Sequence, residues 1–176
     1  MTQRVEGGLT YTQSFDAENR LISVTVNSQT TQFVYDGDGT LMKKIKPDGT
    51  LTVYIGGIYE VELNGTTVTK TTLYYPAAGA VRVIQGGNNN LYYVLKDHLG
   101  SASVTLDSSG NTVAEVRYYP FGETRVNTGT MPTDRLYTGQ RDVGLGLCFS
   151  RPAASTSRGS AIRRSVPLSG RSPDQI

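Results

Sequence analysis

One short stretch of this sequence holds every side-chain type of a serine hydrolase. His98, the only histidine, follows Asp97, and Ser101 comes three residues later. Such chemistry requires the fold to bring all three side chains together, with the imidazole within reach of both partners. Strand neighbours such as Asp97 and His98 point to opposite faces, and Ser101 lacks a G-x-S-x-G context. We therefore predict a turn: Asp97 caps backbone amides, Gly100 takes an unusual φ, and His98 packs or hydrogen-bonds locally.

Two further patterns could suggest a metal ion. Asp36 and Asp38 in "DGDG" faintly resemble a calcium loop, but the remaining spacing of an EF-hand is absent, so we predict a hairpin turn. Cys148 is the only cysteine, which excludes an intrachain disulfide and a cysteine-based metal cluster. We predict no catalytic residues, no metal and no cofactor.

Paired tyrosines form a third candidate, because their rings could stack on bases or sugars. The pairs are Tyr74-Tyr75, Tyr92-Tyr93 and Tyr118-Tyr119. At the ends of alternating strands, such a pair more often packs one ring inward and leaves the other at the surface.

Short β-rich runs alternate with turn signals over the first 125 residues, and no window has apolar residues at helical spacing. "FDAENRL" (15–21) and "YDGDGTL" (35–41) share the form aromatic-Asp-x-x-(Asn/Gly)-x-Leu, 20 residues apart. This predicts an all-β fold in which antiparallel β-hairpin repeats form a curved, twisted sheet. We expect turns near Ala17–Asn19, Gly37–Gly39, Asp48-Gly49, Asn64-Gly65, Gly86–Asn90 and Ser108–Gly110.

Residues in these runs alternate in character. Tyr59, Val61 and Leu63 share one face, while Glu60 and Glu62 take the other. Alternation of this kind suits a sheet with one covered face and one wetter face.

The charge and hydropathy of the chain limit the classes of partner that it could have. Residues 1–150 hold 12 basic and 14 acidic residues, a net charge of −2, so the main body gives no electrostatic reason to propose nucleic acid. The N-terminus has no apolar region typical of a signal peptide, and no apolar run is long enough for a membrane span. Any export signal would lie outside this chain.

The stretch "YYVLKDHLGSASVTLDSSGNTVAEVRYYPFGE" (92–123) resembles the core signature of RHS/YD-repeat proteins. "RLYTGQRDVGLGL" (135–147) resembles the segment that follows it, and the two Tyr/Phe-Asp runs resemble single YD repeats. The resemblance implies hairpins wound into a large hollow shell around a C-terminal toxin or effector. The signature positions, taken as structural, are Asp97, His98, Gly100, Ser101, Asp107, Gly110, Tyr119, Pro120, Phe121, Gly122, Gly139, Gly146 and Leu147.

The resemblance also divides the chain. It implies YD-repeat hairpins over 1–90, the RHS repeat-associated core over 91–147, and an aberrant tail over 148–176. Tyrosine disappears from that tail, where Ser, Arg, Ala and Pro take over. Such a composition buries too little surface to offset its ordering entropy, so we expect disorder from residue 151 and an unpaired edge near Leu145–Phe149. A shifted reading frame could spell Phe-Tyr-x-Pro-x-Leu-Gly there, which predicts a frameshift; a genuine basic tail is the rival reading.

Three functions follow. The first is a structural fragment of a shell without catalysis, secreted or at the cell surface, with the rest of the shell and its effector cargo as partners. The second is a surface-adhesion module that binds glycans through exposed tyrosines such as Tyr118 and Tyr119. The third is self-cleavage, which in the family uses Asp-Pro-x-Gly-Leu motifs; Asp142 in "RDVGLGL" lacks the proline, so this chemistry is not carried over.

Overall fold

The structure is a computed structural model that describes residues 2–145, 147–149 and 162–164. Within these residues it has no α-helix, only the short 3-10 turns η1 (Pro76–Ala78) and η2 (Tyr137–Gly139). No helix in these ranges is both long and apolar enough to span a bilayer. The strands are β1 (Thr2–Glu6), β2 (Leu9–Phe15), β3 (Leu21–Val26), β4 (Gln29–Tyr35), β5 (Leu41–Ile45), β6 (Leu51–Ile55), β7 (Tyr59–Asn64), β8 (Thr67–Tyr75), β9 (Ala80–Gln85), β10 (Asn88–Lys96), β11 (Ala102–Leu106), β12 (Thr112–Tyr118), β13 (Thr124–Gly129), β14 (Arg141–Asp142), β15 (Leu147–Phe149) and β16 (Ile162–Arg164).

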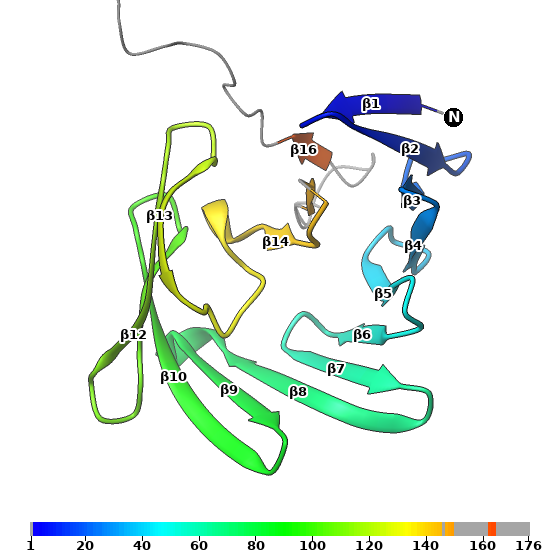
Figure 1. Cartoon of the computed structure of the whole chain (residues 1–176). Coiled ribbons are helices and arrows are strands. Elements are labelled where there is room, and N and C mark those ends of the chain that lie inside the picture. The colour runs from blue at the N-terminus through cyan, green and yellow to red at the C-terminus, as the bar shows by residue number, and fades with distance from the viewer. Residues whose placement is uncertain (1, 146, 150–161, 165–176) are drawn as a thin grey trace, which may run out of the picture.

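The first thirteen strands form one sheet in which every strand pairs with its sequence neighbours, as the predicted all-β hairpin fold requires. The sheet curls strongly, and the chain that follows β13 runs back into its concave side (Figure 1). We call the thirteen-stranded sheet the wall and residues 131–145 the inner segment. The wall face that contacts the inner segment is the inner face.

Because consecutive strands are antiparallel, alternate turns lie on the same rim of the wall. On one rim the turns follow β2, β4, β6, β8, β10 and β12, near residues 16, 36, 56, 76, 97 and 119. The period of about 20 residues therefore continues through the wall, well beyond the two repeats that the Tyr/Phe-Asp signature marks.

Most wide turns on this rim share one geometry. At Asp36 the backbone amide donates to the carbonyl of Thr40, and Gly39 donates back to the carbonyl of Asp36. The Asp36 carboxylate accepts the amides of Asp38 (3.0 Å) and Thr40 (2.8 Å). Gly39 has a φ of +78°, which only residues tolerant of the left-handed region adopt easily. The predicted hairpin turn at "DGDG" is therefore confirmed.

Four of the predicted turns lie where expected, at 17–19, 37–39, 48–49 and 108–110. Two lie slightly elsewhere. Asn64 pairs with Thr67, which leaves Gly65 and Thr66 as the turn. The tight turn after β9 uses only Gly86 and Gly87, so the three asparagines that follow begin β10.

The alternation of β7 has an unexpected orientation. Glu60 points to the inner face and is buried, whereas Tyr59, Val61 and Leu63 lie on the outer face and are half-buried. The covered side of this strand is therefore the one that carries carboxylates. It can be so because the inner segment supplies cations there, as described below.

Apolar packing on the inner face falls into two clusters. Leu21, Val24 and Phe33 pack with Val143 of the inner segment, and Val81, Val94 and Ala102 form the second cluster. In the second cluster, Met131 and Leu136 of the inner segment pack against the wall residues. The inner segment therefore completes the apolar core at both ends.

Strands β14, β15 and β16 form a separate three-stranded sheet. The expectation of an unpaired edge near Leu145–Phe149 is wrong, because β15 pairs with β14 on one side and with β16 on the other. The expectation overlooked Ile162–Arg164, which supplies the second partner. The remainder of the predicted disordered tail lies outside the described residues.

Candidate functional site

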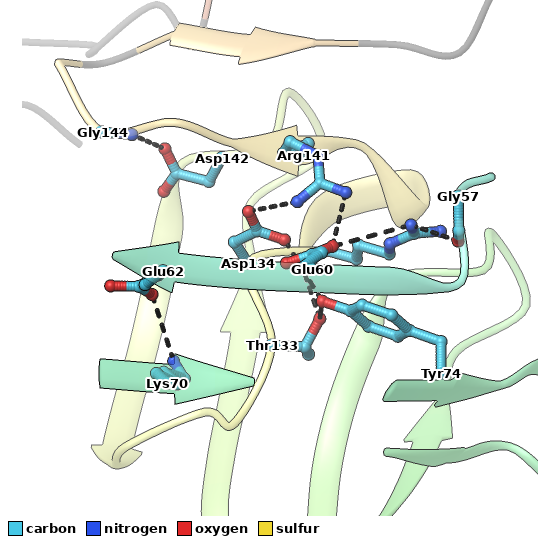
Figure 2. Close-up of polar contacts among 11 residues, drawn as sticks. Gly57, Glu60, Glu62, Lys70, Tyr74, Thr133, Asp134, Arg141, Asp142 and Gly144 are labelled. Atoms are coloured by element: carbon cyan, nitrogen blue, oxygen red, sulfur yellow. Dashed lines mark hydrogen bonds and ion pairs between the residues drawn. The ribbon is translucent and has the colours of Figure 1, made fainter. Parts of the chain in front are cut away.

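A cluster of charged side chains joins the inner segment to the middle of the wall (Figure 2). Arg141 donates one N–H to Asp134 (2.5 Å) and another to Glu60 of β7 (2.6 Å). Arg135 lies 3.8 Å from the same Glu60 carboxylate and donates to the carbonyl of Gly57 at 2.6 Å. Two cations and two carboxylates thus neutralise one another in a largely buried place.

The local structure of the inner segment explains why the two arginines meet. Arg135 and Arg141 form an antiparallel β-bridge around a five-residue turn, in which Leu136 donates to Gln140. Paired residues of antiparallel strands project to the same face, so both guanidinium groups point at the wall. Gly139, with a φ of +69°, allows the turn to close.

Each guanidinium also lies over a tyrosine ring. Arg141 lies 4.0 Å from the ring centroid of Tyr54, and Arg135 lies 4.3 Å from that of Tyr74. The Tyr74 hydroxyl is within 3.1 Å of the hydroxyl of Thr133. Carboxylates hold the edges of the guanidinium groups while tyrosines cover their faces, which is the arrangement that a planar cation favours.

Burial and neighbouring charges shift the titration of this cluster. Burial and the Asp134 carboxylate raise the pKa of Glu60, although Arg141 opposes that rise. Burial works against the charge of Arg141, but Asp134 and Glu60 outweigh it and raise the pKa of Arg141 above its ordinary value. Burial lowers the pKa of Lys44 on the neighbouring β5. Burial also raises the pKa of the Tyr54 and Tyr74 hydroxyls, which stay neutral.

The inner segment has a second set of anchors beside β11 and β12. The amide of Ala102 donates to the carbonyl of Leu136 (3.1 Å), and the amide of Thr138 donates to the Ser101 hydroxyl (3.0 Å). The Tyr137 hydroxyl donates to the carbonyl of Pro120 at 2.6 Å. Three wall elements thus hold one short turn of the inner segment.

A third anchor lies at the other end of the wall. Arg4 of β1 donates to the carbonyl of Leu145 at 2.6 Å, and Val143 is buried among β3 and β4 residues. The inner segment therefore connects strands from both ends of the sheet across its concave side.

The stretch that could have formed a hydrolase site is a turn. The Asp97 carboxylate accepts the amides of Leu99 (2.9 Å) and Ser101 (2.8 Å), and Gly100 has a φ of +82°, as predicted. The Ser101 side chain is fully buried and accepts the Thr138 amide, whereas His98 is exposed. The structure therefore does not bring the three side chains together as a triad.

The other signature positions also lie at turns. The Asp107 carboxylate accepts amides of Ser109 and Asn111, and Gly110 has a φ of +87°. Tyr119, Pro120, Phe121 and Gly122 make the turn between β12 and β13, where Phe121 is 74% exposed. Gly139 lies in the turn of the inner segment, and Leu147 begins β15. Gly146 lies outside the described residues.

The paired tyrosines are arranged as predicted. Tyr74, Tyr92 and Tyr118 are half-buried, while Tyr75, Tyr93 and Tyr119 are exposed. Tyr118 packs against Tyr137, with ring centroids 5.4 Å apart.

Sequence reasoning missed Glu60, Asp134, Arg135 and Arg141. A glutamate that alternates with apolar residues looks solvent-facing, and its arginine partner is 81 residues away. A usable signal was the spacing of Tyr35, Tyr54 and Tyr74, close to the 20-residue period. In the described part of the chain, no three His, Cys, Asp or Glu residues are placed to hold a metal ion.

A wall of successive hairpins with turns every 20 residues, folded around a segment of its own chain, defines a class of repetitive β-shell. Residues 59–139 match the family model described as Teneurin YD-shell. This part of the chain is therefore similar to YD-repeat shells, as its signature residues indicated.

Similar proteins include Teneurin-1 of Mus musculus, 26% identical over 107 residues, which are 56% of this chain and 4% of Teneurin-1. Among solved structures, the crystal structure of TcdB2-TccC3 has a TM-score of 0.68 at 22% identity and covers 81% of this chain and 9% of that one. The Photorhabdus luminescens Tc holotoxin pore has a TM-score of 0.69 at 21% identity and covers 96% of this chain and 10% of that one. This chain thus spans a small part of its relatives.

Proposed function

We propose that this chain is a structural part of a YD-repeat shell that encloses a toxin or effector segment, and that it has no catalysis of its own. The observation that supports this most directly is the inner segment. The wall already curls around a stretch of its own polypeptide and holds it by the Arg141–Glu60 pair and three backbone contacts. A surface that holds extended chain on its concave side suits enclosure.

The proposal extends to the parent protein. Its partners are the remainder of the shell and the enclosed cargo, and it acts outside the cell or at the cell surface. The division into repeat hairpins (1–90), associated core (91–147) and aberrant tail (148–176) belongs to the proposal too, although the wall itself continues unbroken past residue 90.

Limited proteolysis of the parent protein tests enclosure. The complete reading frame that this test needs comes from sequencing the gene on both sides of this chain. The same sequence decides between a frameshift and a genuine tail. We expect the enclosed segment to resist protease while the shell is intact and to be cut once the shell is unfolded. Equal cleavage of the segment in the intact shell and as a free polypeptide would refute enclosure.

The absence of catalysis is tested with the purified chain. Ester, phosphoester and peptide substrates should show no turnover that depends on His98, which is exposed, or Ser101, which is buried. Loss of a measured turnover in His98→Ala, with unchanged circular dichroism, would make the chain an enzyme.

A second candidate function is glycan binding, which the turn between β12 and β13 favours. In this turn Tyr119 is 47% exposed and Phe121 is 74% exposed, whereas the ring of Tyr118 packs against that of Tyr137. Saturable binding to a glycan array that is lost in Tyr119→Ala, but kept in Tyr93→Ala, would support adhesion.

A further inference from the structure

Tyrosines of the inner face recur once in each even-numbered strand of the wall. Tyr54 and Tyr74 face the inner segment in the ion-pair cluster, and Tyr11 and Tyr35 pack against the apolar cluster that includes Val143. The complete series is Tyr11 on β2, Tyr35 on β4, Tyr54 on β6, Tyr74 on β8, Tyr92 on β10 and Tyr118 on β12.

An arginine guanidinium lies over each of four of these rings. Besides the two pairs of the cluster, Arg4 lies 4.4 Å from the ring centroid of Tyr11, and Arg20 lies 5.5 Å from that of Tyr35. Each guanidinium also has an oxygen acceptor: Arg4 donates to Leu145 and Arg20 to Asp16. Arginines from β1, from a wide turn and from the inner segment thus use the same kind of position.

Tyr118 is covered differently, by the ring of Tyr137. Tyr92 is the exception in the part of the chain that the structure describes, since no cation, ring or hydrogen-bond partner is found for it there. The Tyr92 side chain is half-buried, so part of it remains accessible.

The register places Tyr92 on the inner face beside an occupied position. Tyr92 is opposite Val81 of β9, and Val81 is opposite Tyr74 of β8. Directly opposite residues of antiparallel strands project to the same face. Tyr92 is therefore two strands away from the ring that holds Arg135, on the same side of the sheet.

We propose that the ring of Tyr92 is a binding position for a guanidinium group, filled by an arginine side chain of an extended polypeptide that lies on the concave side of the wall. The ligand is arginine and not lysine, because a planar, weakly hydrated guanidinium stacks on an aromatic face better than a compact ammonium. The four occupied positions show this preference within the same molecule. The inference concerns the wall alone and holds whether or not the parent shell encloses a toxin.

The experiment uses the full chain with ¹³C-labelled tyrosine rings and a glycine–serine heptapeptide with one central arginine. Matched peptides carry lysine or the neutral isostere citrulline at that position. We expect the Tyr92 ring signals to shift in a saturable way with the arginine peptide, and little with the others. Tyr92→Ala should weaken binding about two- to fivefold, the range for a partly exposed cation–π contact.

Two variants serve as controls. Tyr92→Phe keeps the ring and should keep the preference for arginine, which separates ring stacking from any effect of Tyr92→Ala on folding. Tyr93→Ala removes the neighbouring outer-face ring, which is 40% exposed, and should leave binding unchanged. The proposal is overturned if citrulline binds as well as arginine, if Tyr92 does not shift, or if Tyr93→Ala weakens binding as much as Tyr92→Ala.

Discussion

The guanidinium of Arg141 lies 2.6 Å from the carboxylate of Glu60, and this contact joins the inner segment to the middle of the wall. The Arg141 and Glu60 side chains are only 12% and 10% exposed. A buried charge without its partner is costly, so the pair works as a constraint on where the inner segment can lie.

The first prediction concerns this pair. Arg141→Met should lower the free energy of unfolding by about 3 kcal/mol, because the buried Glu60 carboxylate loses its main partner. Glu60→Gln should lower it by less, because Arg141 keeps its contact with Asp134. The double variant should lose clearly less than the sum of the two, which urea unfolding of all four proteins measures. Additive losses would mean that the two side chains do not interact.

The second prediction concerns the Asp-capped turns. Asp97→Ala should lower the free energy of unfolding by about 1 kcal/mol, because two backbone amides lose their acceptor. Asp97→Asn keeps a side-chain oxygen and should lose less. Asp38→Ala is the matched control, since Asp38 is an exposed residue of a similar turn. Equal losses in Asp97→Ala and Asp38→Ala would show that capping is unimportant.

The third prediction concerns Gly122, in the turn next to Tyr137. A Cβ there would lie 2.6 Å from Cδ1 of the Tyr137 ring, and the φ of +91° is strained for alanine. Gly110 has a similar φ of +87° but open space around it. Thermal or urea unfolding should show a loss of about 1 kcal/mol for Gly110→Ala and about 3 kcal/mol for Gly122→Ala. Equal losses would argue against the packing of Tyr137 on this turn.

The fourth prediction concerns acid. Turn hydrogen bonds lower the pKa of Asp16, Asp48 and Asp107, so the folded state binds fewer protons than the unfolded chain. Their contribution is present above the unfolded value of about 3.9 and is lost as pH falls through the folded values. The free energy of unfolding should therefore decline below about pH 4. An unchanged value down to pH 2 would contradict this.

The pKa of Glu60 shifts in the opposite direction, because burial and the Asp134 carboxylate raise it in the folded state. Its effect on the pH dependence of stability is therefore also opposite. Its contribution to stability increases as pH falls from the folded pKa towards the unfolded value of about 4.3. Relative to Glu60→Gln, the wild-type chain should therefore gain stability between neutral pH and about pH 4. Parallel pH profiles for the two proteins would refute the raised pKa.

The hairpin wall could be predicted because its determinants are local. Asp107, Gly110 and Asn111 lie within five residues, and the turn they form depends on a side-chain cap and a positive φ. The same holds for the turn at Asp97, which is why that stretch could be separated from a hydrolase site. The two displaced turns, at Gly65 and Gly86, differ by one or a few residues because several neighbouring residues suit a tight turn.

The inner segment could not be predicted in this way. Its contacts join residues far apart in sequence, such as Arg135 with Gly57 and Tyr74 with Thr133. Its presence also changes which face of β7 is buried. In an alternating strand the polar residues usually face solvent, but Glu60 is buried because an arginine of the inner segment reaches it. A pattern confined to one strand contains no information about a partner from another part of the chain.

The central claim is that the inner segment lies docked on the concave side of the wall, and amide hydrogen exchange at Ala102 tests it most directly. The Ala102 amide donates to the carbonyl of Leu136, so its protection depends on the docked inner segment. We expect exchange as slow as that of Val94, whose amide donates to Gly79 within the wall, and markedly faster exchange in Arg141→Met. Exchange of Ala102 at the rate of an unstructured peptide in the wild-type chain would contradict the account.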